Sequence, residues 1–299
     1  MFRWIAVAAV GAVACGHEAS APLLARDDTI PVLRPPASGL LYRTSESVTL
    51  TDPDGTGRRG LKLAFAGADL HPSSGPVVSP DGSLLAFVAP YVTPNGRASV
   101  FVADTTGIVP RFSYHACSRT AVATSWAVSI AWARAGRRLA FLCESPFGAN
   151  LVIYDYTIDR QYYNIAIAPL TNSLAWSPNG RWLLVGSQIY DTAATLSATL
   201  QLPIGLTGLG WSPNNGVMVG PAGECGTGVY LTRPYAGAPL VHLLDSPYRF
   251  AEFSPDGKKL LAITSVCSVL DTSTAVILDA AKLTVERSIV GATWATWRP

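Results

Sequence analysis

The chain of 299 residues repeats one short motif, a large apolar residue followed by a turn of Ser, Pro, Asp or Asn, and Gly. Four copies are clear, and they are Val78–Gly82, Trp176–Gly180, Trp211–Asn215 and Phe253–Gly257. A degraded copy lies at Trp132–Gly136 and a shortened one at Trp297–Pro299. We call this the turn motif. A motif that returns every few tens of residues means that one structural unit is built repeatedly, so the repeat determines the fold class.

Each turn motif lies between two short apolar runs, as in Leu174–Trp176 and Trp182–Val185. This arrangement predicts a β-hairpin, because proline presets φ and glycine accepts positive φ in the turn. A third run that ends in Asp follows, such as Val276–Asp279, and a fourth leads to the next motif, as in Val285–Val290. Four short strands per unit, with no strong helical pattern, are typical of a β-propeller blade.

The number of motifs predicts an all-β, six-bladed β-propeller. The third strand Val48–Asp52 precedes the first full motif, whereas no third strand follows the last motif at Trp297. We therefore expect one blade to combine strands from both halves of the chain, namely Ala292–Trp297, Gly39–Thr44, Val48–Asp52 and Gly60–Phe65. Such pairing closes the ring and removes exposed strand edges. Seven blades are the alternative, if Leu33–Pro35 begins a strand of its own.

The first 14 residues are typical of a signal peptide, with a positive charge at Arg3 and an apolar run from Trp4 to Ala14. Small residues before Cys15 are similar to a bacterial lipobox, in which this cysteine becomes the lipidated first residue. The usual Leu is replaced by Ala12, so plain secretory cleavage near Ala14 is the alternative. Residues 15–28 then form a tether and residues 29–299 a single propeller domain. We expect a lipid-anchored, extracytoplasmic protein of the bacterial cell envelope.

An oxidising compartment favours disulfides among the remaining cysteines, which are Cys117, Cys143, Cys225 and Cys267. Four cysteines allow three pairings, and proximity in neighbouring repeats favours Cys117–Cys143 and Cys225–Cys267. Metal binding is the alternative, but no CxxC or His-x-His spacing supports it. We therefore predict two structural disulfides and no metal site.

The form apolar-Ser-Pro-Asp-Gly-x-x-Leu-apolar-Phe resembles the repeat of TolB-type, WD-like β-propellers, and Val78–Val88 and Phe253–Ile263 match it best. The resemblance covers roughly residues 40–299 and is more specific for fold than for function. Known relatives include periplasmic scaffold proteins and propeller domains that gate serine peptidases. TolB itself has an N-terminal α/β domain that engages partners, and the segment between Cys15 and Gly39 is too short for one. The role in the Tol system is therefore not carried over.

Catalytic patterns are sparse in the sequence. No Gly-x-Ser-x-Gly nucleophile elbow is present, and no motif links the histidines, which are His17, His71, His115 and His242. The Asp residues at third-strand ends are expected to accept hydrogen bonds within turns. The segment Asp52–Gly57 superficially resembles a calcium loop, but it is expected to be the turn that joins a third strand to a fourth. We expect no enzymatic activity and no cofactor. The alternative is a lyase or hydrolase whose histidines hold a metal on the central axis.

A binding role remains as the main functional hypothesis, with a purely architectural envelope protein as a further possibility. The net charge is +2 and the charged residues are scattered, which argues against a nucleic-acid partner. The motif tryptophans at 132, 176, 211 and 297 are expected to pack between blades, which leaves Trp126 and Trp294 as weaker candidates for exposed aromatics. The connections 90–97, 114–126 and 222–227 are the expected recognition loops. We predict a monomeric scaffold for an envelope protein, peptide or glycan.

Overall fold

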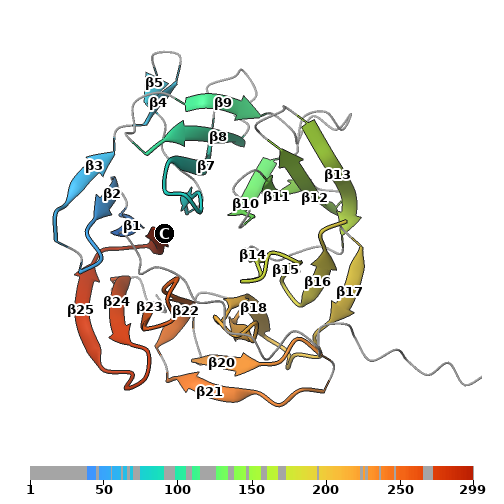
Figure 1. Ribbon diagram of the computed structural model, residues 1–299, viewed down its shortest axis with the longest axis vertical. Coiled ribbons are helices and arrows are strands. Elements are labelled where there is room, and N and C mark those ends of the chain that lie inside the picture. The colour runs from blue at the N-terminus through green and yellow to red at the C-terminus, as the bar shows by residue number, and fades with distance from the viewer. Residues whose placement is uncertain are drawn as a thin grey trace, which may run out of the picture.

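The computed structural model describes residues 39–298 apart from segments 45–46, 55, 62, 66–67, 70–74, 91–97, 106–109, 115–125, 134–137, 146–147, 156–159, 168–172, 194, 223–224, 226–227, 236, 246 and 265–271. Every regular element in this described part is a β-strand. The strands form six four-stranded sheets arranged in a ring, seen down its axis in Figure 1. The all-β, six-bladed propeller is confirmed, and the ring holds six blades rather than seven. Leu33–Pro35, the basis of the seven-blade alternative, lies outside the described residues.

Within each blade the strands follow one another from the axis outward. Blade 1 contains β26 (Trp294–Arg298), β1 (Gly39–Arg43), β2 (Val48–Thr51) and β3 (Arg59–Leu61). Blade 2 contains β6 (Val77–Val78), β7 (Leu84–Pro90), β8 (Ala98–Asp104) and β9 (Pro110–Tyr114). Blade 3 contains β10 (Trp126–Trp132), β11 (Arg138–Ser145), β12 (Gly148–Asp155) and β13 (Arg160–Ile167).

The remaining blades repeat this order. Blade 4 contains β14 (Leu174–Trp176), β15 (Trp182–Val185), β16 (Gln188–Asp191) and β17 (Leu196–Thr199). Blade 5 contains β18 (Leu206–Trp211), β19 (Val217–Pro221), β20 (Val229–Thr232) and β21 (Val241–Leu244). Blade 6 contains β22 (Tyr248–Phe253), β23 (Lys259–Thr264), β24 (Thr274–Asp279) and β25 (Val285–Val290). A small ribbon of β4 (Ala64–Phe65) and β5 (Ala68–Asp69) connects blades 1 and 2.

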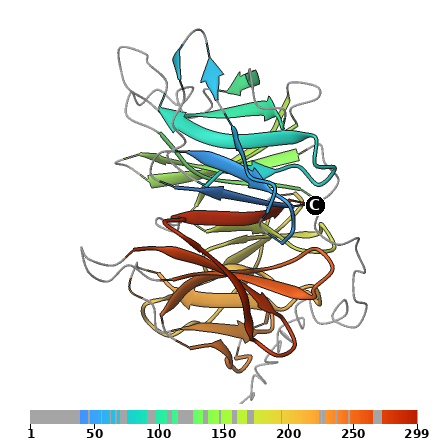
Figure 2. The ribbon, with the colours of Figure 1, turned by 90° about the vertical axis from the view of Figure 1, so that its left-hand side faces the viewer.

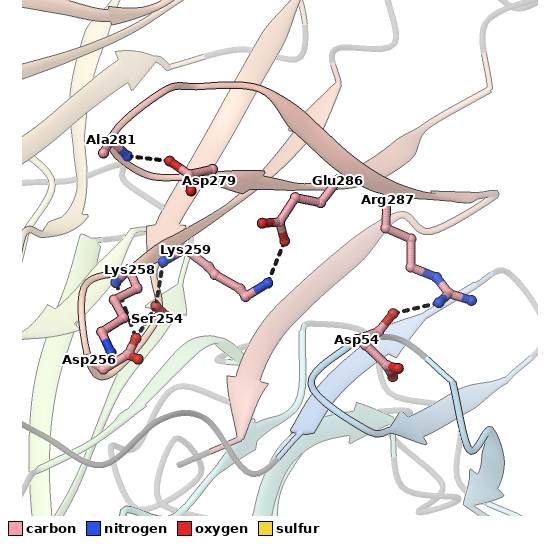
Figure 3. A network of polar contacts seen from close by, with 9 residues as sticks. All are labelled: Asp54, Ser254, Asp256, Lys258, Lys259, Asp279, Ala281, Glu286 and Arg287. Carbon is pink, nitrogen blue, oxygen red and sulfur yellow. Dashed lines mark hydrogen bonds and ion pairs between the residues drawn. The ribbon is translucent and has the colours of Figure 1, made fainter.

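Blade 1 closes the ring by joining strands that are far apart in the sequence. β26 pairs antiparallel with β1, with Gly39 opposite Arg298 and Arg43 opposite Trp294, and Figure 2 shows these red and blue strands side by side. Farther from the axis, blade 6 also contacts blade 1. Arg287 Nη1 on β25 donates to the backbone oxygen of Asp54, between β2 and β3, at 2.6 Å (Figure 3). The predicted closure of the ring is therefore confirmed.

The predicted fourth strand of blade 1, Gly60–Phe65, is wrong in its second half. β3 ends at Leu61, and Ala64–Phe65 pairs instead with β5. Between them Leu63 is buried in a cluster with Val78 and Leu85 of blade 2. Burial of this side chain turns the chain toward the next blade, because leaving a leucine exposed on the edge strand would forfeit its transfer free energy.

The turn motif is held by its serine. Ser177 is fully buried, and its Oγ donates to Asn179 Oδ1 at 2.7 Å and accepts the backbone N–H of Trp182 at 2.9 Å. Ser79 and Ser254 make the same pair of bonds, the latter visible in Figure 3. The following glycines have φ of 71 to 74°, and in the fourth clear copy Asn215 takes this role with φ of 58°. The motif therefore builds hairpins, as predicted, by satisfying its own polar groups.

The core lies between the blades, and the motif tryptophans join neighbouring blades. Trp132, Trp176, Trp211 and Trp297 are only 4 to 8% exposed, which confirms the predicted packing. Three of them also donate an indole N–H to a backbone oxygen of the preceding blade, namely Trp132 to Val77 at 3.1 Å, Trp211 to Ala175 at 3.0 Å and Trp297 to Glu252 at 3.1 Å. Within the described residues, the buried Nε1 of Trp176 has no hydrogen-bond partner.

Candidate functional site

The two ends of the ring differ in what they contain. All innermost strands begin at one end, which we call the loop end, and run toward the turn motifs at the other, the motif end. The connections 90–97, 114–126 and 222–227 join strands at the loop end. Most of their residues lie outside the described part of the chain, although Ala222 and Cys225 are exposed there. The connections singled out from the sequence therefore share one end of the ring.

Two arginines meet at the loop end, in the seam between blades 1 and 6. Arg43 Nε donates to Thr293 Oγ1 at 3.4 Å, and Arg249 Nη2 donates to the Thr293 backbone oxygen at 3.2 Å. Both side chains are half-buried. Burial lowers the pKa of Arg43, and the neighbouring positive charge of Arg249 lowers it further. Two guanidinium groups held in this way can attract a carboxylate or phosphate group of a ligand.

Trp294 stands beside the arginine pair, at the start of β26. Its indole lies directly against Gly75, where a Cβ atom would come within 1.9 Å of the ring. It also packs against the cluster that contains Leu41 and Val78. Trp294 is therefore half-buried between blades 1 and 2 rather than an open aromatic surface. The side chain of Trp126, the other aromatic candidate, is not among the described ones.

Glu252 is the ionisable group of the innermost strands that burial affects most. Its Oε2 accepts a hydrogen bond of 2.7 Å from the hydroxyl of Thr296 on β26. Burial raises the pKa of Glu252 from 4.5 to about 7, although the Thr296 hydroxyl and the Trp297 backbone N–H oppose this shift. The residue nevertheless retains partial solvent exposure. Its carboxyl group can therefore exist as either the acid or the carboxylate near neutral pH.

The histidine alternative receives a partial test from the described residues. His242 lies on β21, the outermost strand of blade 5, where its Nε2 is 3.3 Å from Asp245 Oδ1 and its ring meets Tyr230 edge-on. It therefore stands at the periphery and not on the axis. His17, His71 and His115 lie outside the described residues. In the part that the structure describes, no group of three His, Cys, Asp or Glu side chains could hold a metal ion.

The lipidation and disulfide predictions fall largely outside the described residues. Cys15, Cys117 and Cys267 are not described. Cys143 is buried on β11, and Cys225 is exposed between β19 and β20. Since neither predicted pair has both cysteines described, Cys117–Cys143 and Cys225–Cys267 stay predictions. A search of the described residues for a membrane-spanning helix finds none.

The Asp residues at third-strand ends behave as the sequence predicted where the structure describes them. Asp279 Oδ1 accepts the backbone N–H groups of Ala281 and Lys282, the first of which is drawn in Figure 3. Asp191 accepts those of Ala193 and Thr195 in the same way. These carboxylates therefore close turns. In the calcium-like loop, the backbone N–H of Asp52 bonds to the Thr56 carbonyl oxygen at 3.0 Å, and the loop is likewise a turn.

Sequence reasoning missed the arginine pair, Thr293, Glu252 and Thr296. A signal for Glu252 was present, since it immediately precedes the apolar residue of its turn motif. The other copies have Val77, Ala131, Ala175, Gly210 and Thr296 at that position. Aligning the six copies would therefore have marked Glu252 as their one acidic member. The arginine pair had no such signal, because Arg43 and Arg249 meet only through closure of the ring.

Comparisons with known proteins identify the fold. No protein-family model matches the chain, and no curated protein matches it. The crystal structure of TolB from Acinetobacter baumannii superposes with a TM-score of 0.59 at 14% identity, over 87% of this chain and 64% of that one. The β-propeller domain of the Trilobed protease from Pyrococcus furiosus gives 0.49 at 11% identity, over 86% and 92%. This chain thus spans less than two thirds of the TolB chain, and what it shares with TolB is the β-propeller fold.

Proposed function

We propose that this protein is a lipid-anchored, extracytoplasmic β-propeller that binds an envelope protein, peptide or glycan at the loop end of its ring, as a monomer and without catalysis. The observation that carries the proposal is the arginine pair at Thr293, which concentrates positive charge at the end where the expected recognition loops also lie. The signal-peptide-like segment and Cys15 support the location. The repeat of this chain resembles that of TolB-type propellers, whose known members include periplasmic scaffolds. This resemblance supports a scaffold role, as does the β-propeller fold that the chain shares with TolB.

The motif end is a poorer candidate for recognition, because the serine hydroxyls and the Asp or Asn side-chain oxygens of its turns are already engaged. Asp81, Asn179 and Asp256 each accept a bond from the serine of their own turn and from a nearby backbone N–H. The Ser79 hydroxyl accordingly holds the pKa of Asp81 below its usual value. Side-chain oxygens that already accept hydrogen bonds within their own turn have little left to offer a partner. Rigid blades that carry variable connections at the opposite end are the usual arrangement of a binding scaffold.

Site-specific photo-crosslinking in the native envelope tests this proposal. A photoreactive phenylalanine analogue replaces Ser47 or Ala222 at the loop end, both of which are exposed. Matched variants carry it at Lys258 and Arg181, which directly follow two turn motifs at the other end and are also exposed. We expect covalent adducts with an envelope component from Ser47 and Ala222 and none from the motif end. Equal adducts from both ends, or none from any position, would contradict binding at the loop end.

The arginine pair provides the matching loss-of-binding test. Replacing Arg43 and Arg249 by Gln removes both charges and should reduce the adduct formed from Ser47 or Ala222. Gln retains an N–H donor for Thr293, so the seam keeps much of its hydrogen bonding. Unchanged adduct yield in this double variant would show that the arginine pair does not take part in recognition.

A further inference from the structure

A β-bulge places Arg249 on the side of blade 6 that faces blade 1. The register of β22 against β23 shifts between Tyr248 and Phe250, so Arg249 is the extra residue of the bulge. Residues two apart on a regular strand share one face. Here, however, Tyr248 packs against the cluster that contains Met218 of blade 5, whereas Phe250 packs against the cluster that contains Leu40 of blade 1. The strand therefore turns at Arg249.

The fold does not require an arginine in this bulge. The innermost strand of blade 3, β10, has a bulge at the same distance from its turn motif, and the extra residue there is Val128. Bulges are frequent next to functional sites, because they re-aim a side chain. In blade 6 the re-aimed side chain reaches across the seam, where Arg249 Nη2 donates to the Thr293 backbone oxygen at 3.2 Å.

Arg43 approaches the same residue from blade 1. The N–H and Oγ1 of Thr293 donate to the Arg43 carbonyl oxygen at 2.8 and 3.2 Å, and Arg43 Nε donates to Thr293 Oγ1 at 3.4 Å. Both the backbone and the side chain of Arg43 are thus fixed at Thr293. The two positive charges lie close enough for Arg249 to lower the pKa of Arg43. Like charges held together repel each other, and an anion bound between them offsets this repulsion.

The backbone donors near the arginine pair are already in use, which favours a carboxylate over a phosphate. The N–H groups of Gly291 and Thr293 donate to the carbonyl oxygens of Ser273 and Arg43, at 2.9 and 2.8 Å. The regular elements of the described chain are all strands, so no helix N-terminus among them faces the pair. Phosphate groups are often bound by such backbone donors, in nests or at helix N-termini. A guanidinium fork binds a planar carboxylate without them.

We propose that Arg43 and Arg249 together bind one carboxylate group across the seam between blades 1 and 6, and that an acidic peptide segment of the partner supplies it from an aspartate or glutamate side chain. This inference rests on the proposed function, because the carboxylate belongs to the bound partner. A peptide fits better than an acidic sugar, since the indole of Trp294 beside the pair packs against Gly75 and is not open for stacking on a sugar ring.

Peptides that differ at a single side chain test this site. The probes are the pentapeptide Gly-Gly-Glu-Gly-Gly with blocked ends, its twins with glutamine or phosphoserine at the centre, and glucuronic acid. Each is titrated into the full chain as processed by the cell, at about pH 7.5 and roughly 20 mM salt, where charges are screened little, with binding followed by calorimetry. The variants are Arg43→Gln and Arg249→Gln. Arg181→Gln, at an exposed position of the motif end, is the control with the same loss of charge.

We expect the glutamate peptide to bind the wild type and Arg181→Gln at least about tenfold more tightly than the glutamine peptide, because hydrogen bonds to a charged acceptor are lost in the twin. Arg43→Gln and Arg249→Gln should each lose this preference, since the carboxylate bridges the two side chains. Gln keeps an N–H donor for Thr293, and a melting temperature at or above that of the wild type would show that each variant folds. The comparison of the two peptides on the wild type needs no variant.

Equal binding of the glutamate and glutamine peptides to the wild type, or no binding of either at millimolar concentration, overturns the inference. A preference that persists in both arginine variants overturns it as well. Binding of the phosphoserine peptide or of glucuronic acid about tenfold more tightly than the glutamate peptide would assign the pair to a phosphate or a sugar instead. Adducts from Ser47 or Ala222 in the wild type would in each of these cases leave the proposed function standing.

Discussion

Glu252 and Ser177 illustrate how differently polar side chains near the axis are stabilised. Ser177 is buried within a turn that supplies both a donor and an acceptor. Glu252 has the Thr296 hydroxyl and the Trp297 backbone N–H, and no basic side chain is among the causes of its pKa shift. Serine does not ionise, so its burial costs the same at every pH. Burial of Glu252 costs more when its carboxyl group is ionised, because desolvation disfavours the charged form. The free energy of unfolding should therefore contain a pH-dependent contribution from Glu252.

Replacing Glu252 by Gln should remove a pH-dependent loss of stability. The pKa of Glu252 is raised to about 7 in the folded protein, so below pH 4.5 both states hold the proton and the residue imposes no ionisation penalty. As pH rises toward about 7 the unfolded chain ionises first, and the folded state becomes less stable. At about 1.4 kcal/mol per pKa unit, the penalty is on the order of 3 kcal/mol above pH 7. Urea unfolding at about pH 4 and pH 8 measures it.

The informative quantity is the difference between wild type and Glu252→Gln at each pH, because contributions of other groups cancel. The variant should be more stable than wild type at pH 8 and about equal to it at pH 4. Glu286→Gln is the control, since Glu286 is an exposed partner of Lys259 and such pairs contribute about 1 kcal/mol or less. A wild-type to Glu252→Gln difference that does not change with pH would show that Glu252 keeps its ordinary pKa.

At the scale of strands, the sequence predicted correctly those elements that the repeated turn motif marks. The turn motif located the hairpins, and β15 spans the predicted Trp182–Val185. The ribbon of β4 and β5 was missed because burial of Leu63 depends on the neighbouring blade and leaves no local pattern. Packing of the motif tryptophans was predicted from their position. Their hydrogen bonds were not, since the acceptors belong to the preceding blade. The arginine pair was also missed, because its two members belong to different blades.

Replacement of the motif tryptophans by Phe should separate packing from hydrogen bonding. Trp297→Phe and Trp211→Phe each lose an indole N–H that bonds a carbonyl oxygen of the preceding blade, at 3.1 and 3.0 Å. Trp176→Phe is the matched control, because no described group accepts from its buried Nε1. We expect each of the first two to cost about 1 kcal/mol more than the control in urea unfolding. Equal losses in all three variants would mean that the interblade bonds add nothing.

For the molecule as a whole, stability should depend on β26. This strand completes blade 1, and Trp297 packs in the same cluster as Leu261 and Ile277 of blade 6. Deleting residues 293–299 would expose the edge of β1 and remove the buried Trp297, for which core losses of about 3–5 kcal/mol are usual. We expect the truncated chain to lose its cooperative unfolding transition and to aggregate. Circular dichroism during heating and size-exclusion chromatography would detect both changes.

A circular permutant is the control, because it keeps β26 and its contacts but changes the order of the strands along the chain. Gly39 lies opposite Arg298 in an antiparallel pair, so a two-residue Asn-Gly turn can connect Arg298 to Gly39. New ends are then placed between Gln201 and Leu202, in the connection from β17 to β18. This permutant should unfold cooperatively near the wild-type temperature. A folded truncated chain, or an unfolded permutant, would contradict the role assigned to β26.

The position of β26 in the chain has a consequence for the time course of folding. Leu40 lies opposite Trp297 in blade 1, and the other five blades lie between these two residues in the sequence. The pairing of β1 with β26 therefore cannot form until those five blades have been synthesised. At about 5–20 residues per second, the incomplete blade persists for tens of seconds with an unpaired edge. Contacts at such sequence separation also form slowly, because closing a long loop carries an entropy cost. The nascent protein is therefore an open arc for most of its synthesis, and it becomes a ring in one late step.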